Sequence, residues 1–296
     1  MTTTSGSLSA LPNAGKEARE RRERTRMLAG GLLGGIICVF WLLPLLLVLM
    51  NAFKDKREYN LGESWQLPHS LHLWQNLQHA WAQGLGSGFL NSLSYGLIGS
   101  AGAIFLASLA AFGIVRLRIP RGLWWFLLIY SGTIFPFQVY LIPLFKAYSS
   151  FGLYDTWGGM VLFYIAICIP FCTFVMRGFF VSLPWDFQEA AKLDGCNDWL
   201  IFIRIMVPLA RAPMLVLLLF QFTWIWNDLL FGLVLSKSES VRPIMPTLAG
   251  MQGIYSASDG PTVIAAVLIA SLPTLLLFLL LRPYFMQGLR LSSVGD

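Results

Sequence analysis

Six long apolar runs are the feature that most restricts what this 296-residue chain can fold into. Hydrophobic residues make up 56% of the sequence and charged residues only 12%, which is more apolar surface than one water-soluble core can hide. Each run is long enough to cross a hydrocarbon core of roughly 30 Å. The predicted spans are about 28–50, 88–115, 122–146, 158–181, 212–235 and 262–282.

Every span is predicted to be a helix, because lipid offers no hydrogen-bond partner to an unpaired backbone group and the runs show no alternating barrel pattern. The fold class is therefore all-α, a polytopic membrane protein with six transmembrane helices. Residues 1–27 are predicted to form an N-terminal tail, and residues 28–290 form the transmembrane domain. That domain includes a polar loop at 182–211, and residues 291–296 form a short C-terminal tail.

The basic residues predict the orientation of the chain. They precede the first span at 16–26 and fill the connections at 116–121 and 192–211. Because cytoplasmic loops carry the excess of Lys and Arg, both termini are predicted to be cytoplasmic. The net charge of +6 is thus mostly a topology signal, and no exposed face combines basic and aromatic residues as nucleic-acid binding requires.

The sequence offers no support for catalysis or for a bound metal. His69, His72 and His79 all fall in the first external loop without neighbouring Cys or carboxylate ligands, which makes a poor metal site. No Gly-x-Ser-x-Gly elbow is present, and Gly15-Lys16 is followed by Glu17 rather than by the Ser or Thr of a phosphate-binding loop. If ATP drives this protein, another subunit must bind the nucleotide.

A short polar segment between the fourth and fifth spans is the most informative part of the loop. Asp186 lies three residues before Glu189, the spacing of an N-cap with its capping-box carboxylate, and Gly195 stands where a helix would end in a left-handed residue. Asp194 would lie at a helix C-terminus, where a specific donor is expected. An apolar face that needs a partner is predicted from Phe187, Ala190, Ala191 and Leu193. The alternative is an amphipathic hairpin at the membrane surface without a partner.

The spacing of this segment is similar to a known signature. Glu189-Ala190-Ala191, three residues, Gly195, nine residues, Ile205, one residue and then Val207-Pro208 resembles the coupling loop of bacterial ABC importer permeases. The resemblance extends over nearly all of residues 28 to 288 to the second, G-type permease subunit of maltose-type sugar importers. Its supporting stretches are Asn91-Ser92-Leu93, Ala110-Ala111-Phe112 with Arg116, Phe135-Pro136, Pro143-Leu144-Phe145, Gly152-Leu153 with Thr156, Arg177-Gly178-Phe179-Phe180 and Trp226-Asn227-Asp228.

This resemblance implies a type I importer permease fold in a bacterial inner membrane. It also implies a second homologous permease subunit, two ATPase subunits that hold ATP and Mg²⁺, and a periplasmic solute-binding protein. The transported molecule would be a sugar, an oligosaccharide or a sugar-derived solute, and this chain would need no cofactor of its own. The implied ATPase-coupling residues are Asp186, Glu189, Ala190, Ala191, Asp194, Gly195, Ile205 and Pro208.

Polar residues inside the predicted spans form a second class of candidates, because they are costly in lipid unless they face partners or water. Amide and carboxylate groups can bind sugar hydroxyls, and a tryptophan plane suits the apolar face of a sugar ring. The alternative is hydrogen bonding between helices and anchoring of aromatic residues at the interface. Gln221 is one such buried polar residue, and the candidate substrate-path residues are Gln138, Thr223, Trp224, Asn227 and Asp228.

Two other functions remain as alternatives. An ion-coupled secondary transporter of a small polar solute would normally show internal repeats and several intramembrane carboxylates. This sequence shows no repeat, and Asp228 is the only carboxylate predicted well inside a span. A membrane assembly scaffold would explain the apolar runs but not the spacing between Glu189 and Pro208.

Overall fold

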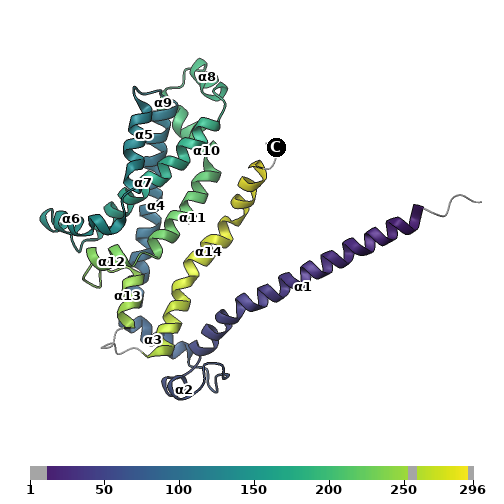
Figure 1. The fold of residues 1–296 in the computed structure, drawn as a ribbon. Helices are drawn as coiled ribbons and strands as arrows, with labels where there is room; N and C mark the ends of the chain where they lie inside the picture. Colours follow the sequence, from purple (N-terminus) through teal and green to yellow (C-terminus); the bar gives the residue numbers. More distant parts are fainter. Residues whose placement is uncertain (1–11, 253–258, 293–296) are drawn as a thin grey trace, which may run out of the picture. The chain divides into compact units, whose positions relative to one another are not determined.

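The structure is a computed structural model that describes residues 12–252 and 259–292 (Figure 1). All the regular elements within these two ranges are helices. The chain divides after His72 into two compact units, residues 1–72 and 73–296. The predicted all-α class is therefore confirmed for the part of the chain that is described.

Unit 1 consists of α1 (Pro12–Ala52), α2 (Lys56–Leu61) and the loop that follows. Residues 12–27 of the predicted tail are the first turns of α1, while residues 1–11 lie outside the described ranges. Asp55 begins α2 by accepting a hydrogen bond from the N–H of Glu58 at 2.6 Å. The buried Lys54 donates from Nζ to the carbonyl oxygen of Glu63 at 3.0 Å, so its ammonium is hydrogen-bonded within the loop.

Unit 2 contains the remaining helices, joined by short connections. They are α3 (Leu73–Ala80), α4 (Gly86–Val115), α5 (Gly122–Tyr130), α6 (Phe137–Ser150), α7 (Trp157–Ser182), α8 (Asp186–Leu193), α9 (Asp198–Ile201), α10 (Val207–Leu209), α11 (Arg211–Trp226), α12 (Leu230–Leu235), α13 (Ile244–Met251) and α14 (Gly260–Ser292). Some of them are connected by a kink at Trp81–Leu85, where Gly84 has a φ of +88°, by a π-helical segment at Phe202–Met206 and by a 3-10 turn at Ser131–Thr133.

Within the described residues, four stretches are long and apolar enough to cross a membrane: Arg21–Ala52, Leu73–Val115, Trp157–Ser182 and Gly260–Pro283. The number rises to six if two bent pairs of helices each count as one span. The pairs are Gly122–Thr133 with Phe137–Ser150, bent by 93°, and Asp198–Leu209 with Arg211–Trp226, bent by 74°. Five of these stretches contain the predicted spans they match. The pair Asp198–Leu209 with Arg211–Trp226 overlaps the predicted fifth span only from residue 212 to 226, and its first part lies in the predicted loop 182–211.

The third predicted span differs from a continuous helix, because the chain breaks between α5 and α6. Pro136 has an extended ψ of 133° at the start of α6. A proline lacks the backbone N–H that a helix interior requires, and its ring disfavours the helical conformation of the preceding Phe135. The apolar run 122–146 is therefore two helices rather than one.

The fifth predicted span, 212–235, also contains a break. α11 ends at Trp226, and α12 begins at Leu230. The carboxylate of Asp228 accepts hydrogen bonds from the N–H groups of Phe231 at 3.3 Å and Gly232 at 3.1 Å. A buried aspartate in this position satisfies the free N–H groups at the start of the new helix, which stabilises the interruption.

The core of unit 2 forms where α4 packs closely against α7 and α11. Small residues line the buried face of α4, and two of them leave no room for a larger side chain. A Cβ at Gly96 would lie 2.7 Å from the Phe222 ring, and one at Gly99 would lie 3.0 Å from the Cβ of Tyr164. Small residues allow helices to approach closely in lipid, where van der Waals packing replaces the hydrophobic effect.

One carboxylate joins two connections of unit 2. Asp155, in the α6–α7 connection, has a φ of +55°. Its Oδ1 accepts hydrogen bonds from the N–H of Lys237 at 2.7 Å, the N–H of Ser238 at 2.9 Å and the Ser238 Oγ at 3.0 Å. Partial burial raises the pKa of Asp155, but these hydrogen bonds outweigh that effect and hold the pKa below its ordinary value. The charged carboxylate therefore fixes the α6–α7 connection against the α12–α13 connection.

Candidate functional site

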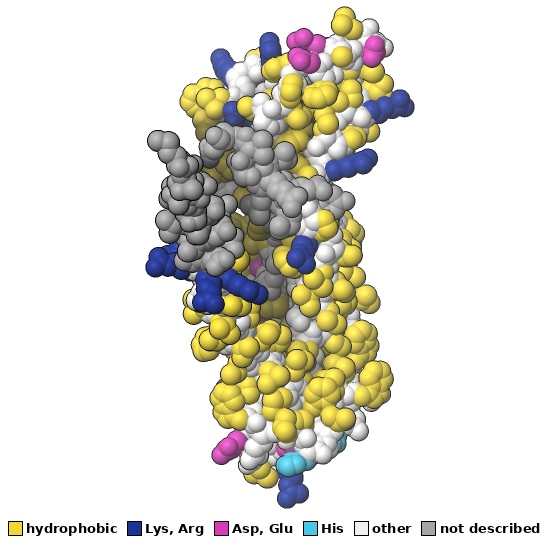
Figure 2. All heavy atoms as spheres, turned by 90° about the vertical axis from the view of Figure 1, so that its right-hand side faces the viewer, with side chains coloured by type: hydrophobic (Ala, Val, Ile, Leu, Met, Phe, Trp, Pro, Cys, Tyr) yellow, Lys and Arg dark blue, Asp and Glu magenta, His cyan; other side chains and the backbone are white. Residues whose placement is uncertain are grey.

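The helix α8 lies at one end of unit 2, far from α3 (Figure 1). Leu193 is 90% exposed and Phe187 is 46% exposed, and Glu189 and Ala190 are exposed beside them. Ala191 is buried on the opposite side of the helix. Figure 2 shows acidic side chains next to hydrophobic ones at this end of the unit. The free side of α8 thus combines apolar and acidic groups.

The start of α8 differs from the predicted N-cap at Asp186. Asp186 is the first helical residue rather than an N-cap, because Trp185 already has helical angles, with φ −72° and ψ −25°, and supplies no capping side chain. The carbonyl oxygen of Trp185 accepts hydrogen bonds from the N–H groups of Gln188 at 2.9 Å and Glu189 at 3.1 Å. The predicted capping box is therefore wrong, although the negative charge of Asp186 in the first turn still stabilises the N-terminus of the helix.

The end of α8 is a tight turn, as predicted. Gly195 has a φ of +82°. The N–H of Cys196 donates to the Ala191 carbonyl oxygen at 2.9 Å, and the N–H of Gly195 donates to that of Lys192 at 3.1 Å. This pair of hydrogen bonds is a Schellman motif, in which glycine adopts the left-handed conformation without the steric penalty of a Cβ.

The two limbs of the turn are also joined by side chains. Lys192 Nζ lies 3.4 Å from Asp198 Oδ1, and Asn197 accepts a hydrogen bond from the N–H of Leu200 at 2.8 Å to begin α9. The expectation that a specific donor binds Asp194 is wrong for the part of the chain that is described, since no residue there donates to its carboxylate. Asp194 is exposed, and water can solvate it.

The second limb continues into the core. Ile205 is half-buried in the π-helical segment Phe202–Met206, and Pro208 is half-buried in α10. The neighbouring Phe202 and Met206 are fully buried. The predicted coupling residues are thus divided between an exposed first limb and an anchored second limb, joined by the turn at Gly195.

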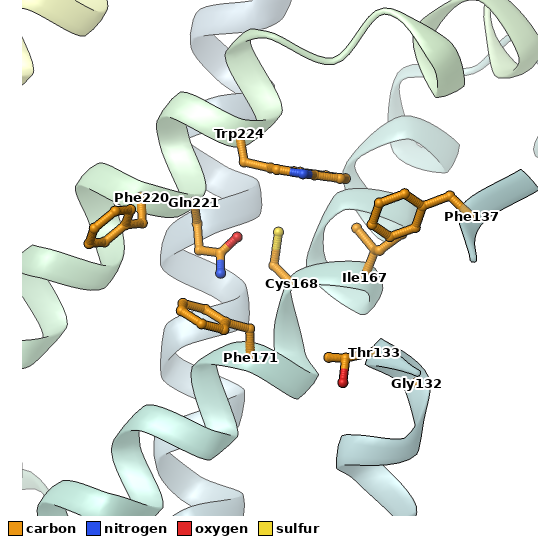
Figure 3. Close-up of a pocket in the computed structure, with 9 residues that line it drawn as sticks. All are labelled: Gly132, Thr133, Phe137, Ile167, Cys168, Phe171, Phe220, Gln221 and Trp224. Atoms are coloured by element: carbon orange, nitrogen blue, oxygen red, sulfur yellow. The ribbon is translucent and has the colours of Figure 1, made fainter. Parts of the chain in front are cut away.

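A cavity of about 290 Å³ lies between α6, α7, α11 and the 3-10 turn that follows α5 (Figure 3). Figure 3 shows the Gln221 amide and the Trp224 indole directed into it from α11, with Phe137 facing Trp224. The ring centroids of Phe137 and Trp224 are 6.0 Å apart. The lining residues are Gly132, Thr133, Phe137, Ile167, Cys168, Phe171, Phe220, Gln221 and Trp224.

Among the predicted substrate-path residues, only Trp224 lines this cavity. Gln138 is exposed, and Thr223 is half-buried. Asn227 is exposed and donates from its amide to the Thr223 carbonyl oxygen at 2.7 Å. Asp228 is buried and accepts a hydrogen bond from the Tyr164 hydroxyl at 2.9 Å in addition to capping α12.

The other cavity residues were not identified as site residues from sequence. Gln221 was visible as a buried polar residue, but its position beside Trp224 depends on how α11 faces α7. Phe137 and Thr133 come together across the break at Pro136, and the proline itself was the signal that a bend could open a space there.

The comparisons with known proteins agree with this architecture. The family described as "Binding-protein-dependent transport system inner membrane component" matches residues 103–290. The probable ABC transporter permease protein YurM of Bacillus subtilis (strain 168) is 32% identical over 253 residues, covering 85% of this chain and 83% of that protein. The diacetylchitobiose uptake system permease protein NgcG of Streptomyces coelicolor is 30% identical, covering 81% and 80%.

A solved structure has the same fold. It is that of a bacterial ABC transporter involved in the import of the acidic polysaccharide alginate, and one of its chains superimposes with a TM-score of 0.77. The sequence identity is 20%, and the superposition covers 90% of this chain and 98% of that chain. The family match spans well over half of the sequence, and this protein therefore belongs to the inner-membrane components of binding-protein-dependent transport systems.

Proposed function

We propose that this multi-pass inner membrane protein is a permease subunit of an ATP-driven importer for a sugar, an oligosaccharide or a sugar-derived solute. A periplasmic binding protein would deliver the solute, and a second homologous permease subunit would complete the path. Two separate ATPase subunits would bind ATP and Mg²⁺. The observation that carries the proposal is α8, a short helix with an exposed apolar and acidic side that is held by a tight turn.

The exposed side of α8 supports docking on an ATPase. Large apolar side chains in water mark an interaction site when they gather beside polar groups, as Phe187 and Leu193 do beside Glu189. In this proposal Glu189 pairs with the ATPase, and Ala190 permits close approach. Ala191 packs inward, and Gly195 holds the turn through which α8 transmits motion to α11.

The cavity supports a path for a carbohydrate. Gln221 can both donate and accept hydrogen bonds, and the Trp224 indole offers a flat surface to a sugar ring. The Streptomyces relative is named for diacetylchitobiose uptake and the solved structure for alginate import, which favours a carbohydrate as the solute. Gln138, Thr223 and Asn227 would extend this path, and Asp228 would hold the helix break beside it.

The proposal is tested by measuring which energy source drives solute uptake. The chain is reconstituted into proteoliposomes with its partner permease, the ATPase and the binding protein, and uptake of labelled solute is measured. We expect uptake only with ATP on the ATPase side and with the binding protein present. Uptake driven by a proton or sodium gradient without ATP would instead support an ion-coupled secondary transporter.

A further inference from the structure

Arg116 is a buried arginine at the end of α4, with 3% of its surface exposed. Its Nη2 donates to the carbonyl oxygens of Phe180 at 2.8 Å and Leu183 at 2.7 Å, and its Nη1 donates to that of Pro184 at 3.4 Å. These carbonyls lie at and just beyond the end of α7, where a helix leaves carbonyl groups without internal partners. The guanidinium therefore caps α7 from another helix.

The charge of Arg116 is not balanced by a carboxylate in the described part of the chain. Its hydrogen-bond acceptors there are neutral carbonyl groups, and its Nε has no partner among those residues. Burying a cation is costly even when partial charges at a helix C-terminus compensate for it. Stability alone does not call for an arginine here, whereas its planar fork can hold several acceptors in one fixed arrangement.

Arg116 also contacts the start of α8. Its guanidinium carbon lies 4.5 Å from the centre of the Trp185 ring, within the range of a cation–π contact. Its carbonyl oxygen accepts a hydrogen bond from Nε2 of Gln188, a buried residue in the first turn of α8, at 3.4 Å. One residue thus joins the end of α4, the end of α7 and the beginning of α8.

We propose that Arg116 is a positioning residue that fixes α8 to α4 and α7, so that a displacement of α8 moves both helices together. The inference rests on the proposed function, in which α8 docks on an ATPase, but Arg116 itself contacts no ATPase. Without its side chain, the guanidinium link between α4, the carbonyls at the end of α7 and Trp185 would be lost. The remaining contacts of α8 with the end of α4 would be the 3.4 Å hydrogen bond from Gln188 to the backbone carbonyl of residue 116 and the exposed Arg118 over Trp185. A displacement of α8 would then be passed on to α4 and α7 less completely.

The first test uses the purified chain alone and does not depend on the proposed function. Hydrogen–deuterium exchange is measured for wild type, Arg116→Ala and Arg118→Ala. We expect amides of residues 186–193 to exchange about tenfold faster in Arg116→Ala, because local opening becomes easier, with residues 160–176 unchanged. Arg118 is a matched control, since it also lies over Trp185, at 4.4 Å, but is exposed. Unchanged exchange in Arg116→Ala, or an equal increase in Arg118→Ala, would overturn the proposal.

The second test uses the assembled importer. We expect Arg116→Ala to copurify with the ATPase but to lose about fivefold in the stimulation of ATP hydrolysis by the solute-loaded binding protein, since the docking side of α8 is untouched. Arg116→Lys should restore part of that stimulation, because an ammonium group can donate to some of the same carbonyls although it lacks the planar fork of arginine.

The two variants separate the possible failures. Wild-type stimulation in Arg116→Ala, or no rescue by Arg116→Lys, contradicts the positioning role. If Arg116→Ala does not insert into the membrane, the stimulation of ATP hydrolysis in Arg116→Lys is the deciding measurement. Failure of Arg116→Lys to insert, or to be stimulated, also contradicts the positioning role. If wild type itself is not stimulated, the proposed function fails, and the exchange measurement still decides whether Arg116 fixes α8.

Discussion

Replacement of Gly195 by valine is expected to lower solute-stimulated ATP hydrolysis by the assembled importer about tenfold or more, with membrane insertion intact. The backbone of Gly195 has a φ of +82°, which a β-branched side chain resists. A Cβ built at this position meets no atom within 4 Å, so the expected effect comes from backbone strain within this chain. Relief of that strain would tilt α8 and displace its docking side from the ATPase.

Two matched variants isolate the cause. Gly195→Asn should retain most of the stimulation, because asparagine tolerates the left-handed conformation. Gly178→Val introduces the same side chain in α7 at a glycine with open space and no positive φ, and it should stay within about twofold of wild type. Full stimulation in Gly195→Val would contradict the transmission of motion through this turn. Equal losses in Gly195→Asn and Gly195→Val would place the effect in the docking contact instead.

The second large effect is expected in the cavity. Gln221→Leu keeps the approximate size of the side chain but removes its amide, and we expect solute uptake to fall about tenfold. Trp224→Ala removes the flat surface that faces Phe137 and should reduce uptake at least as much. Complex assembly and basal ATP hydrolysis should remain near wild type, because both changes act on the solute path. Uptake and basal hydrolysis are measured in the same proteoliposomes.

The controls distinguish the cavity from its surroundings. Gln75→Leu makes the same change at an exposed position of α3 and should leave uptake unchanged. Asn227→Ala should have a smaller effect than Gln221→Leu, because the Asn227 amide donates to a backbone carbonyl and does not line the cavity. A larger loss in Asn227→Ala would mean that the solute contacts Asn227 rather than the residues that line the cavity.

Local patterns predicted the helices and the turn at Gly195. The apolar runs identified the spans because their length and composition are sufficient evidence in a membrane. The spacing of Glu189 and Gly195 predicted a short helix that ends in a left-handed residue, and the positive φ of Gly195 confirms that turn. These features depend on residues that are close in sequence.

Features that depend on distant residues could not be predicted. The predicted capping box did not anticipate that Trp185 already has helical angles, nor that its ring lies against Arg116 and Arg118, almost seventy residues earlier. The break at Asp228 lies within a run whose hydropathy is continuous, and Asp228 is held by Tyr164 of another helix. The break at Pro136 differs, because the proline itself was a local signal for a bend. The cavity requires α6, α7 and α11 to meet, which no periodicity within one helix encodes.

Cross-linking at Leu193 is the most direct test of the proposed contact between α8 and a separate ATPase. A photoreactive amino acid is placed at Leu193, which is 90% exposed, and the assembled importer is irradiated. The same substitution at Leu61 in α2, which is 78% exposed in the loop predicted to be external, is the control. We expect an adduct between this chain and the ATPase from Leu193 and none from Leu61. An importer that hydrolyses ATP normally but forms no ATPase adduct at Leu193 would contradict the proposed contact.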